Sequence, residues 1–430
     1  MLAGIIPLNK KKFVLNRSNK CENISIKSKR KQQEIKKSIL LHNIQIVYPG
    51  QRIEHGSLLL EDDIIKCINP VKASLSPDME RIDGKNCLLT PGLIDLHTHG
   101  IHTYLYDFSA EHCLAGSRIL PEYGTTSFCP TLIPHVTPEL LDKLETYASI
   151  LTRAEGALIP GLHLEGPFVA LPGAGCETAK ADIGLLDEII SACKHQLRIM
   201  SISPDSPGIL PVIERLCEYG VIPFMTHTRA TVEQTQAALD AGARHATHFY
   251  DVFPMPEETD AGVRPAGAVE TILSDPRASV DFIADGVHVH PVAIKVALAA
   301  KSYERVLLIT DSNIGTGLPP GTYETPWGYP VKAAPGKGAR IADPDHPSFG
   351  GLAGSTLTMN QGIANLLQWL NIPSEQVWAF GTLNPARLLK LTEQGIIKEG
   401  AQANLVLWNN KLEPLMTCVK GSWVYRRKEK

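Results

Sequence analysis

The chain has 430 residues, of which 43% are hydrophobic and 20% are charged, and its formal net charge is −3 at pH 7. These values are typical of a soluble globular protein with one large domain and a smaller one. No apolar run approaches the roughly 20 residues that a bilayer span needs, so a membrane protein is excluded.

The ends of the chain and its cysteines indicate the compartment. Residues 1–8 are too brief an apolar stretch for a signal peptide, and lysines follow them directly. The nine cysteines are scattered singly, with no Cys-x-x-Cys pair to suggest a structural zinc or redox site. We therefore expect a cytoplasmic protein that has no membrane partner.

Residues 1–37 are strongly basic, with eleven Lys or Arg against two Glu, so the remainder of the chain carries a net charge of −12. This segment is poor in aromatic residues and contains no nucleic-acid-binding motif, which is typical of a disordered extension. We expect no nucleic-acid partner. Organelle targeting, weak polyanion binding and a non-native extension stay open as explanations.

Short strands and tight turns follow. Residues 43–47, 57–60 and 64–68 have the pattern of β-strands, and similar runs return near the C-terminus at 403–408 and 421–425. Because both ends share this character, the sequence predicts a small discontinuous β-sandwich domain that is built from residues 38–90 and 395–430.

The central segment, residues 91–394, alternates short apolar runs with helical-looking stretches, which is the pattern of βα units and a parallel sheet. Eight runs qualify as strands, and eight is the number in a TIM (β/α)8 barrel. The predicted strands are residues 93–96, 126–129, 157–164, 197–202, 221–225, 245–249, 280–284 and 306–309.

Polar side chains close six of these eight runs. In a TIM barrel, residues at the carboxyl ends of the strands meet at one mouth and carry the chemistry. Moreover, two histidines one residue apart on a strand share a face, as in the His-x-His pair that ends the first run. The polar residues at the strand ends are His97, His99, His163, Glu165, His227, His248, Asp285, His288 and Asp311.

Imidazole and carboxylate together suit a divalent transition metal, Zn²⁺ or Fe²⁺, rather than Ca²⁺ or Mg²⁺. Not every histidine or aspartate in this set needs a metal. We interpret His163 and His245 as histidines held by ordinary hydrogen bonds, and Asp285 as a turn residue before Gly286.

A metal held by these residues predicts hydrolysis. It would lower the pKa of bound water and polarise a carbonyl, so the expected nucleophile is metal-bound hydroxide. Asp311 is the best-placed general base and acid, taking a proton from water and passing it to a leaving amine, although an aspartate here could instead cap the next helix. His288 is the candidate for contact with the substrate.

At this point the chain resembles the amidohydrolase superfamily and, within it, the N-acetylglucosamine-6-phosphate deacetylase family. The resemblance extends from about residue 44 to residue 425. It is carried by residues 91–100, 161–168, 246–250, 284–289, 308–311, 352–359, 384–386 and 395–406.

The resemblance implies specific roles. Glu165, His227 and His248 would form the principal metal site, and Asp311 would be the general base and acid. His97 and His99 imply a second metal, which gives one or two ions per chain that share Glu165 and Asp311. His288 matches the family histidine that contacts the substrate. Relatives are commonly homodimers, so we expect a homodimer.

Three departures from the family pattern concern the substrate pocket. Asp251 stands where the family has an asparagine, and an added carboxylate repels a phosphate. Residues 171–178 replace the family's Lys-Gly-x-His loop. Arg264 lies at a shifted spacing from the family arginine and is the best anion-binding candidate, although a surface salt bridge explains it almost as well.

The sequence therefore predicts a metal-dependent amide hydrolase whose substrate is an N-acetylated amino sugar, phosphorylated if Arg264 can bind the phosphate. The alternatives are another amidohydrolase activity, such as N-acyl amino acid or cyclic amide hydrolysis, and a catalytically silent scaffold that uses the barrel for assembly.

Overall fold

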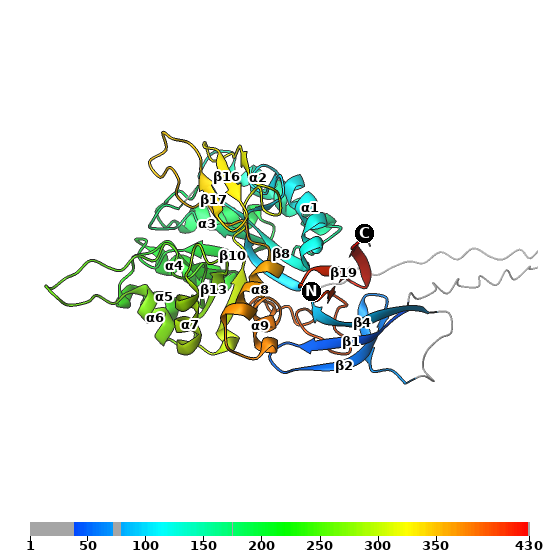
Figure 1. Cartoon of the computed structure of the whole chain (residues 1–430). Helices are drawn as coiled ribbons and strands as arrows, with labels where there is room; N and C mark the ends of the chain where they lie inside the picture. Colours follow the sequence, from blue (N-terminus) through cyan, green and yellow to red (C-terminus); the bar gives the residue numbers. More distant parts are fainter. Residues whose placement is uncertain (1–37, 72–78, 174, 429–430) are drawn as a thin grey trace, which may run out of the picture. The chain divides into compact units, whose positions relative to one another are not determined.

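The structure is a computed structural model that describes residues 38–71, 79–173 and 175–428 (Figure 1). The basic segment 1–37 lies outside the described residues, so the expectation of a disordered extension stays a prediction. In the part of the chain that the structure describes, no helix combines the length and apolar character of a bilayer span.

Eight parallel strands form a nearly closed barrel, in the order β14-β13-β12-β11-β10-β9-β8-β5, which confirms the predicted fold. Each of the eight predicted runs contributes one strand. Burial is complete or nearly so along most of them, as expected for parallel strands covered on both faces. The strands are β5 (Leu93–Thr98), β8 (Thr125–Leu132), β9 (Leu162–Glu165), β10 (Leu197–Ile202), β11 (Ile222–Met225), β12 (His245–Ala246), β13 (Ser279–Ile283) and β14 (Val306–Ile309).

The two edges of this sheet meet just beyond β14. Thr98 and Ser312 form a parallel bridge, and the Asp311 amide donates a hydrogen bond of 2.8 Å to the carbonyl of His97. The ends of the first and eighth strands are therefore hydrogen-bonded at the mouth of the barrel, where the predicted site residues lie.

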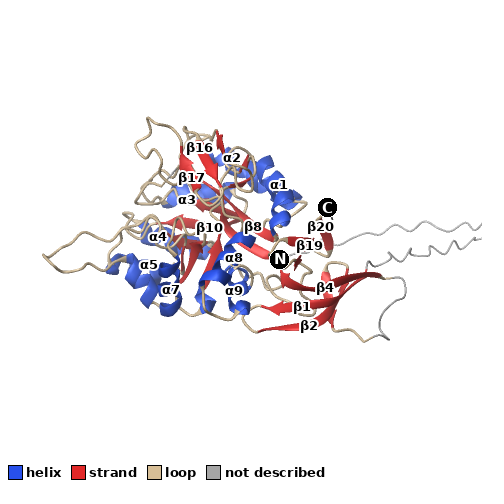
Figure 2. Ribbon diagram, viewed as in Figure 1, coloured by secondary structure: helices blue, strands red, loops and turns tan. Residues whose placement is uncertain are grey.

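Ten α-helices of the described chain surround the strands (Figure 2). The amphipathic pattern of α4 is clear, because Ile209, Val212, Ile213 and Leu216 all face the core at helical spacing. The helices are α1 (Ala110–Ile119), α2 (Leu140–Ile150), α3 (Ile183–Ala192), α4 (Ile209–Glu218), α5 (Val232–Ala241), α6 (Ala268–Ser274), α7 (Pro291–Ala300), α8 (Met359–Trp369), α9 (Ser374–Phe380) and α10 (Leu383–Leu388).

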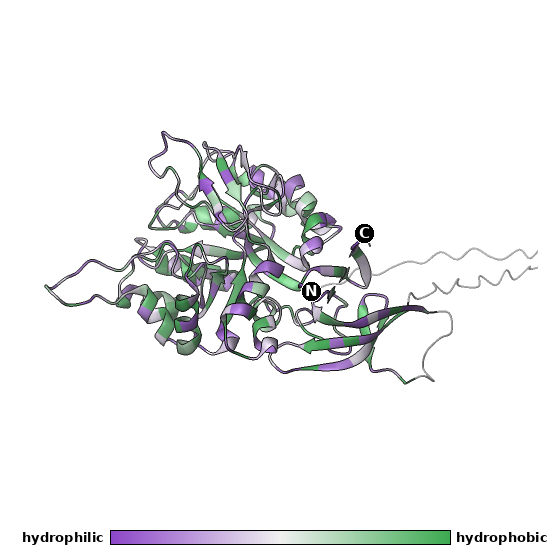
Figure 3. Cartoon of the chain, in the orientation of Figure 1, coloured by the Kyte–Doolittle hydropathy of each residue, from purple (hydrophilic) through white to green (hydrophobic). Residues whose placement is uncertain are grey.

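Both ends of the described chain build one seven-stranded mixed sheet, in the order β20-β19-β18-β4-β1-β2-β3. The start of β4 is hydrophilic and exposed, whereas its end is buried (Figure 3). The strands are β1 (Ser38–Tyr48), β2 (Arg52–Glu61), β3 (Ile64–Ile68), β4 (Glu80–Pro91), β18 (Leu405–Trp408), β19 (Pro414–Val419) and β20 (Ser422–Arg426).

This sheet has its own apolar cluster, which includes Ile44, Ile46 and Leu405, and it also packs on the barrel. Trp408 joins the barrel core, with its ring 5.4 Å from that of Trp378 on α9. The described chain forms one compact unit. The discontinuous sheet is thus confirmed, while the domain boundaries at residues 90 and 395 stay a prediction.

An insertion after β14 covers part of the mouth of the barrel. It forms a three-stranded antiparallel sheet of β15 (Gly321–Tyr323), β16 (Val331–Ala334) and β17 (Gly338–Ile341), with its own apolar cluster around Val331 and Tyr329. A second small hairpin, β6 (Gly100–Ile101) with β7 (Tyr104–Leu105), follows β5. Neither the three-stranded sheet nor the β6–β7 hairpin was predicted from the sequence.

Candidate metal centre

The His-x-His pair lies at the end of β5 and points into the mouth of the barrel. The Nε2 atoms of His97 and His99 are 3.3 Å apart, and both rings are buried. His97 Nδ1 lies 2.9 Å from the hydroxyl of Thr247, which orients its ring. Both Nε2 atoms are thus directed to one place, as the alternation of side chains along a strand predicts.

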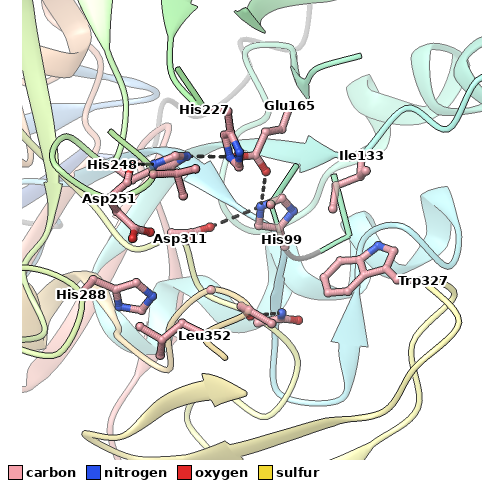
Figure 4. Close-up of a pocket in the computed structure, with 15 residues that line it drawn as sticks. His99, Ile133, Glu165, His227, His248, Asp251, His288, Asp311, Trp327 and Leu352 are labelled. Carbon is pink, nitrogen blue, oxygen red and sulfur yellow. Dashed lines mark hydrogen bonds and ion pairs between the residues drawn. The ribbon is translucent and has the colours of Figure 1, made fainter. Parts of the chain in front are cut away.

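Glu165, the last residue of β9, faces four imidazoles, and those of His99, His227 and His248 are drawn in Figure 4. Its Oε1 is 3.2 Å from His227 Nε2 and 3.0 Å from His248 Nε2. Its Oε2 is 3.2 Å from His99 Nε2 and 3.6 Å from His97 Nε2. One carboxylate therefore joins two pairs of histidines that come from opposite parts of the barrel.

Asp311 approaches the same place from the end of β14. Its Oδ1 lies 3.3 Å from His99 Nε2 and 3.6 Å from His97 Nε2. The backbone of Asp311 has φ 48°, and His227 and His248 also have positive φ, at 48° and 33°. Non-glycine residues rarely adopt this region, and such strain concentrates at functional sites.

The ring orientations leave Nε2 as the inward atom of the histidines. His227 Nδ1 donates to the carbonyl of Leu171 at 3.1 Å, which directs its other nitrogen toward Glu165. Hydrogen bonding of one ring nitrogen to a carbonyl is the usual way in which a metal-ligating histidine is oriented.

The charges at this site are tightly coupled. Burial opposes protonation of His248, but its hydrogen bond to Glu165 outweighs this effect and raises its pKa to about 10. Burial opposes ionisation of Glu165, yet the nearby charge of His97 and the hydrogen bonds from His227 and His248 hold its pKa well below the usual value. Because a metal ligates the deprotonated imidazole, a cation that binds here would displace these protons.

These residues fit a transition metal. Two groups of buried side chains, His97–His99–Glu165 and Glu165–His227–His248, each offer ligand atoms within 4.8 Å of one another. Nitrogen donors combined with carboxylate oxygens are the donor set of zinc and non-haem iron proteins. Glu165 belongs to both groups.

A pocket of about 300 Å³ opens above this cluster. His288 and Asp251 line it on one side, and Ile133 and Trp327 line it on the other (Figure 4). His288 Nδ1 donates to Asp285 Oδ2 at 2.8 Å. Burial opposes the charged form of His288, but the bond to Asp285 outweighs it, so the pKa of His288 is raised.

The comparisons with known proteins agree with this geometry. Residues 88–424 match the model of the family described as "Amidohydrolase family". The chain belongs to the amidohydrolase family.

Curated relatives of this amidohydrolase extend over most of its length. The chain is 32% identical over 391 residues to N-acetylglucosamine-6-phosphate deacetylase of Vibrio furnissii, which covers 88% of this chain and 94% of the relative. It is 29% identical to N-acetylgalactosamine-6-phosphate deacetylase of Escherichia coli O157:H7, which covers 86% and 94% of the two chains.

A solved structure of a variant N-acetyl-D-glucosamine-6-phosphate deacetylase from Mycobacterium smegmatis, in complex with N-acetyl-D-glucosamine-6-phosphate, matches with a TM-score of 0.78 and 26% identity. The match covers 90% of this amidohydrolase and 99% of the solved chain.

The structure places the other predicted residues of this amidohydrolase as follows. His163 and His245 have ordinary partners, since His163 Nε2 is 2.8 Å from the Ser201 hydroxyl and His245 Nε2 is 2.7 Å from Asp281. Their geometry agrees with the interpretation of both as structural histidines. Asp285 combines two roles, because it accepts from the turn amides and also from the ring of His288.

Arg264 is not among the described residues that line the pocket. Its side chain is 74% exposed and pairs with Glu270 at 2.8 Å. Asp251, by contrast, lines the pocket beside His288. The predicted role of Arg264 as an anion-binding residue stays a prediction, and the pair with Glu270 is the interaction that the structure shows.

Sequence reasoning missed several residues of this amidohydrolase pocket. Trp327 comes from the insertion after β14, which no strand pattern marks. Ile133 directly follows β8, and Leu352 begins the segment 352–359 that the resemblance includes, but neither was assigned to the pocket. Gly173, in the loop that departs from the family pattern, is the one with a readable signal: a Cβ there would lie 2.1 Å from Cε1 of His227, so the loop needs glycine to approach the ring.

Proposed function

We propose that this amidohydrolase removes the acetyl group from an N-acetylated amino sugar, releasing acetate and a free amine. The observation that carries the proposal is the Glu165 carboxylate, which joins two histidine pairs beside Asp311 at the mouth of an amidohydrolase barrel. Relatives at about 30% identity over most of the chain are deacetylases of amino sugar phosphates.

The proposal assigns the ligands residue by residue. Glu165, His227 and His248 would hold one metal ion, and His97 and His99 would hold a second, with Glu165 and Asp311 shared. When bound, zinc or iron at such a site lowers the pKa of water toward neutrality and polarises the amide carbonyl.

Asp311 supplies the proton transfers. Its carboxylate lies beside the histidine cluster, where it accepts the proton that water loses on adding to the carbonyl. The protonated Asp311 then donates to the amide nitrogen as the C–N bond breaks, so the amine leaves neutral. Burial opposes ionisation of Asp311, but its hydrogen bond to His99 outweighs burial and lowers its pKa, so the carboxyl is ionised.

His288 is the proposed contact for the substrate. Because Asp285 accepts from its Nδ1 and favours the protonated ring, Nε2 is free to donate a hydrogen bond into the pocket. A carbonyl or sugar oxygen is the acceptor that fits there.

The proposal leaves one point about the substrate to be tested, namely whether the amino sugar is phosphorylated. No Lys or Arg occurs among the described residues that line the pocket, whereas Asp251 adds a carboxylate.

The test compares matched substrates, N-acetylglucosamine and N-acetylglucosamine 6-phosphate, with an N-acetyl amino acid as a third arm. Acetate release from either sugar, lost in Asp311→Asn, supports the proposal.

Two different outcomes would contradict the proposed deacetylation. Activity on the N-acetyl amino acid alone would favour the other amidohydrolase chemistry. Absence of bound metal together with no release from any substrate would favour a silent scaffold, although all the proposed ligands are present in the chain.

A further inference from the structure

The metal pocket has two ends of different chemistry. Asp251 and His288 lie on one side of the histidine cluster, and Ile133 and Trp327 lie on the other (Figure 4). The first end can exchange hydrogen bonds with several hydroxyl groups, which suits an amino sugar. The second end is apolar, which suits the methyl of an acyl group.

A second cavity of about 430 Å³ lies behind the apolar end, and Ile133 and Trp327 line both spaces. Leu140 and Pro326 continue its apolar wall. Four of its charged groups form two pairs: Lys143 Nζ lies 3.4 Å from Asp107, and His135 Nδ1 lies 3.2 Å from Glu177. The fifth, Glu139, is exposed to solvent, so an alkyl chain would contact the apolar wall.

Trp327 is the larger part of the wall between the two spaces. Its ring is edge-on to that of His99, with the centroids 6.1 Å apart. The ring also lies close to Gly175, where a Cβ would lie 3.1 Å from the indole Cδ2. Gly175 also has φ 79°, so glycine at this position both permits the turn and leaves room for the ring.

Packing alone holds this indole in place. Within the described residues, the buried Nε1 of Trp327 has no hydrogen-bond partner. Shortening the side chain therefore breaks no hydrogen bond, and it removes the largest group that separates the metal pocket from the second cavity.

We propose that Trp327 and Ile133 determine the length of the acyl group that the enzyme removes, and that the second cavity is a subsite for acyl chains longer than acetyl. This inference rests on the proposed amide hydrolysis. The reaction itself is unchanged: water adds to the carbonyl, the C–N bond breaks, the acyl group leaves as a carboxylate and the nitrogen receives a proton.

The test measures kcat/KM for N-acetyl- and N-butyrylglucosamine, phosphorylated or not according to which form the wild type uses. In Trp327→Ala the butyryl-to-acetyl ratio should rise by about tenfold or more, since each methylene in an apolar pocket changes discrimination by roughly 10- to 200-fold. Trp327→Phe keeps a ring at the wall and should leave the ratio close to the wild-type value.

A matched control addresses the other end of the pocket. Leu352 is near His288, because a Cβ added at Gly338 would lie 2.7 Å from Leu352 Cδ2 and 3.7 Å from His288 Cε1. Leu352→Ala should change KM for the sugar without changing the acyl ratio. If Leu352→Ala shifts the ratio as much as Trp327→Ala does, or if Trp327→Ala leaves it within twofold, the inference is wrong.

Circular dichroism and metal content verify that each variant is folded and loaded. If Trp327→Ala does not fold, Ile133→Ala opens the same wall from its other half and carries the same expected shift. A wild type that hydrolyses no N-acylated amino sugar would instead contradict the proposed function.

Discussion

The buried carboxylate of Asp95 on β5 accepts a hydrogen bond of 2.6 Å from the hydroxyl of Thr310, the residue before Asp311. Asp95 also accepts from the backbone amides of Thr310 and His97, at 3.2 and 3.3 Å. It thus links the first and last strands of the barrel directly beneath two proposed metal ligands. Burial raises its pKa to about 7, the expected result for a carboxyl that exchanges water for a few hydrogen bonds.

Thr310→Val tests this link. The valine keeps the shape of the side chain but removes the hydroxyl that Asp95 needs, so the free energy of unfolding should fall by about 1–3 kcal/mol. Turnover should also fall, because Asp311 loses its support. Urea denaturation and acetate release measure the two effects. Thr310→Ser, which retains the hydroxyl, should stay close to the wild type in activity; equal losses in both variants would contradict the link.

Asp311→Asn tests the proton transfer. The amide cannot accept a proton from water, and its shape is nearly that of the carboxylate, so kcat should fall by about 10²–10⁴-fold. Metal content should persist, because Glu165 and the four histidines remain. Metal analysis of the purified variant separates a loss of proton transfer from a loss of the ion, and unchanged turnover would exclude the proposed role.

Much of the barrel could be predicted because buried parallel strands leave a direct signature, a short apolar run followed by a polar residue. All eight runs became strands, but β12 is shorter than the predicted run 245–249. The chain turns there because His248 and Tyr250 have positive φ. Such a conformation depends on tertiary contacts, and propensity in a short run does not reveal it.

The proposed metal ligands could be predicted for the same reason, since each lies at or just beyond the end of a barrel strand. The residues that form the pocket walls could not be predicted in this way. Trp327 and Leu352 come from the insertion after β14 and the segment that follows it, and only the folded chain brings them to the mouth of the barrel. Arg264 shows the converse, because a motif spacing suggested a site residue and the structure pairs its side chain with Glu270.

Gly173→Ala tests the close approach of the 171–173 segment to His227. The added methyl would lie 2.1 Å from the ring, so the loop or the ring must move and the ring loses its bond to the Leu171 carbonyl. Loss of such an orienting bond typically costs about 10–100-fold in metal affinity or activity. Zinc titration of the metal-free protein measures this change.

Gly184→Ala is the matched control for that substitution. It lies in α3, has no strained φ, and a Cβ there meets only the Asp182 side chain at 3.2 Å. Alanine in a helix should leave zinc affinity unchanged and stability equal or slightly higher. An equal fall in zinc affinity in both variants would mean that the contact with His227 is not the cause.

Asp275 gives a prediction of pH dependence that is independent of the metal centre. Hydrogen bonds from Arg277 outweigh its partial burial and lower its pKa from 3.8 to about 2. A carboxyl with a lowered folded-state pKa stabilises the fold above its unfolded pKa, and this contribution is lost as pH falls from about 3.8 toward 2. Asp275→Asn should therefore be less stable than the wild type near neutral pH, and the difference should narrow below pH 4.

The size of that difference is limited by solvent. Arg277 is 38% exposed, so we expect about 1–2 kcal/mol at pH 7 after screening. Urea denaturation of both proteins across pH 3–7 measures it, and high salt should reduce it. Asp260→Asn, in an exposed loop, controls for the change in net charge. A difference that stays constant down to pH 3 would show that the pair with Arg277 does not stabilise the ionised form.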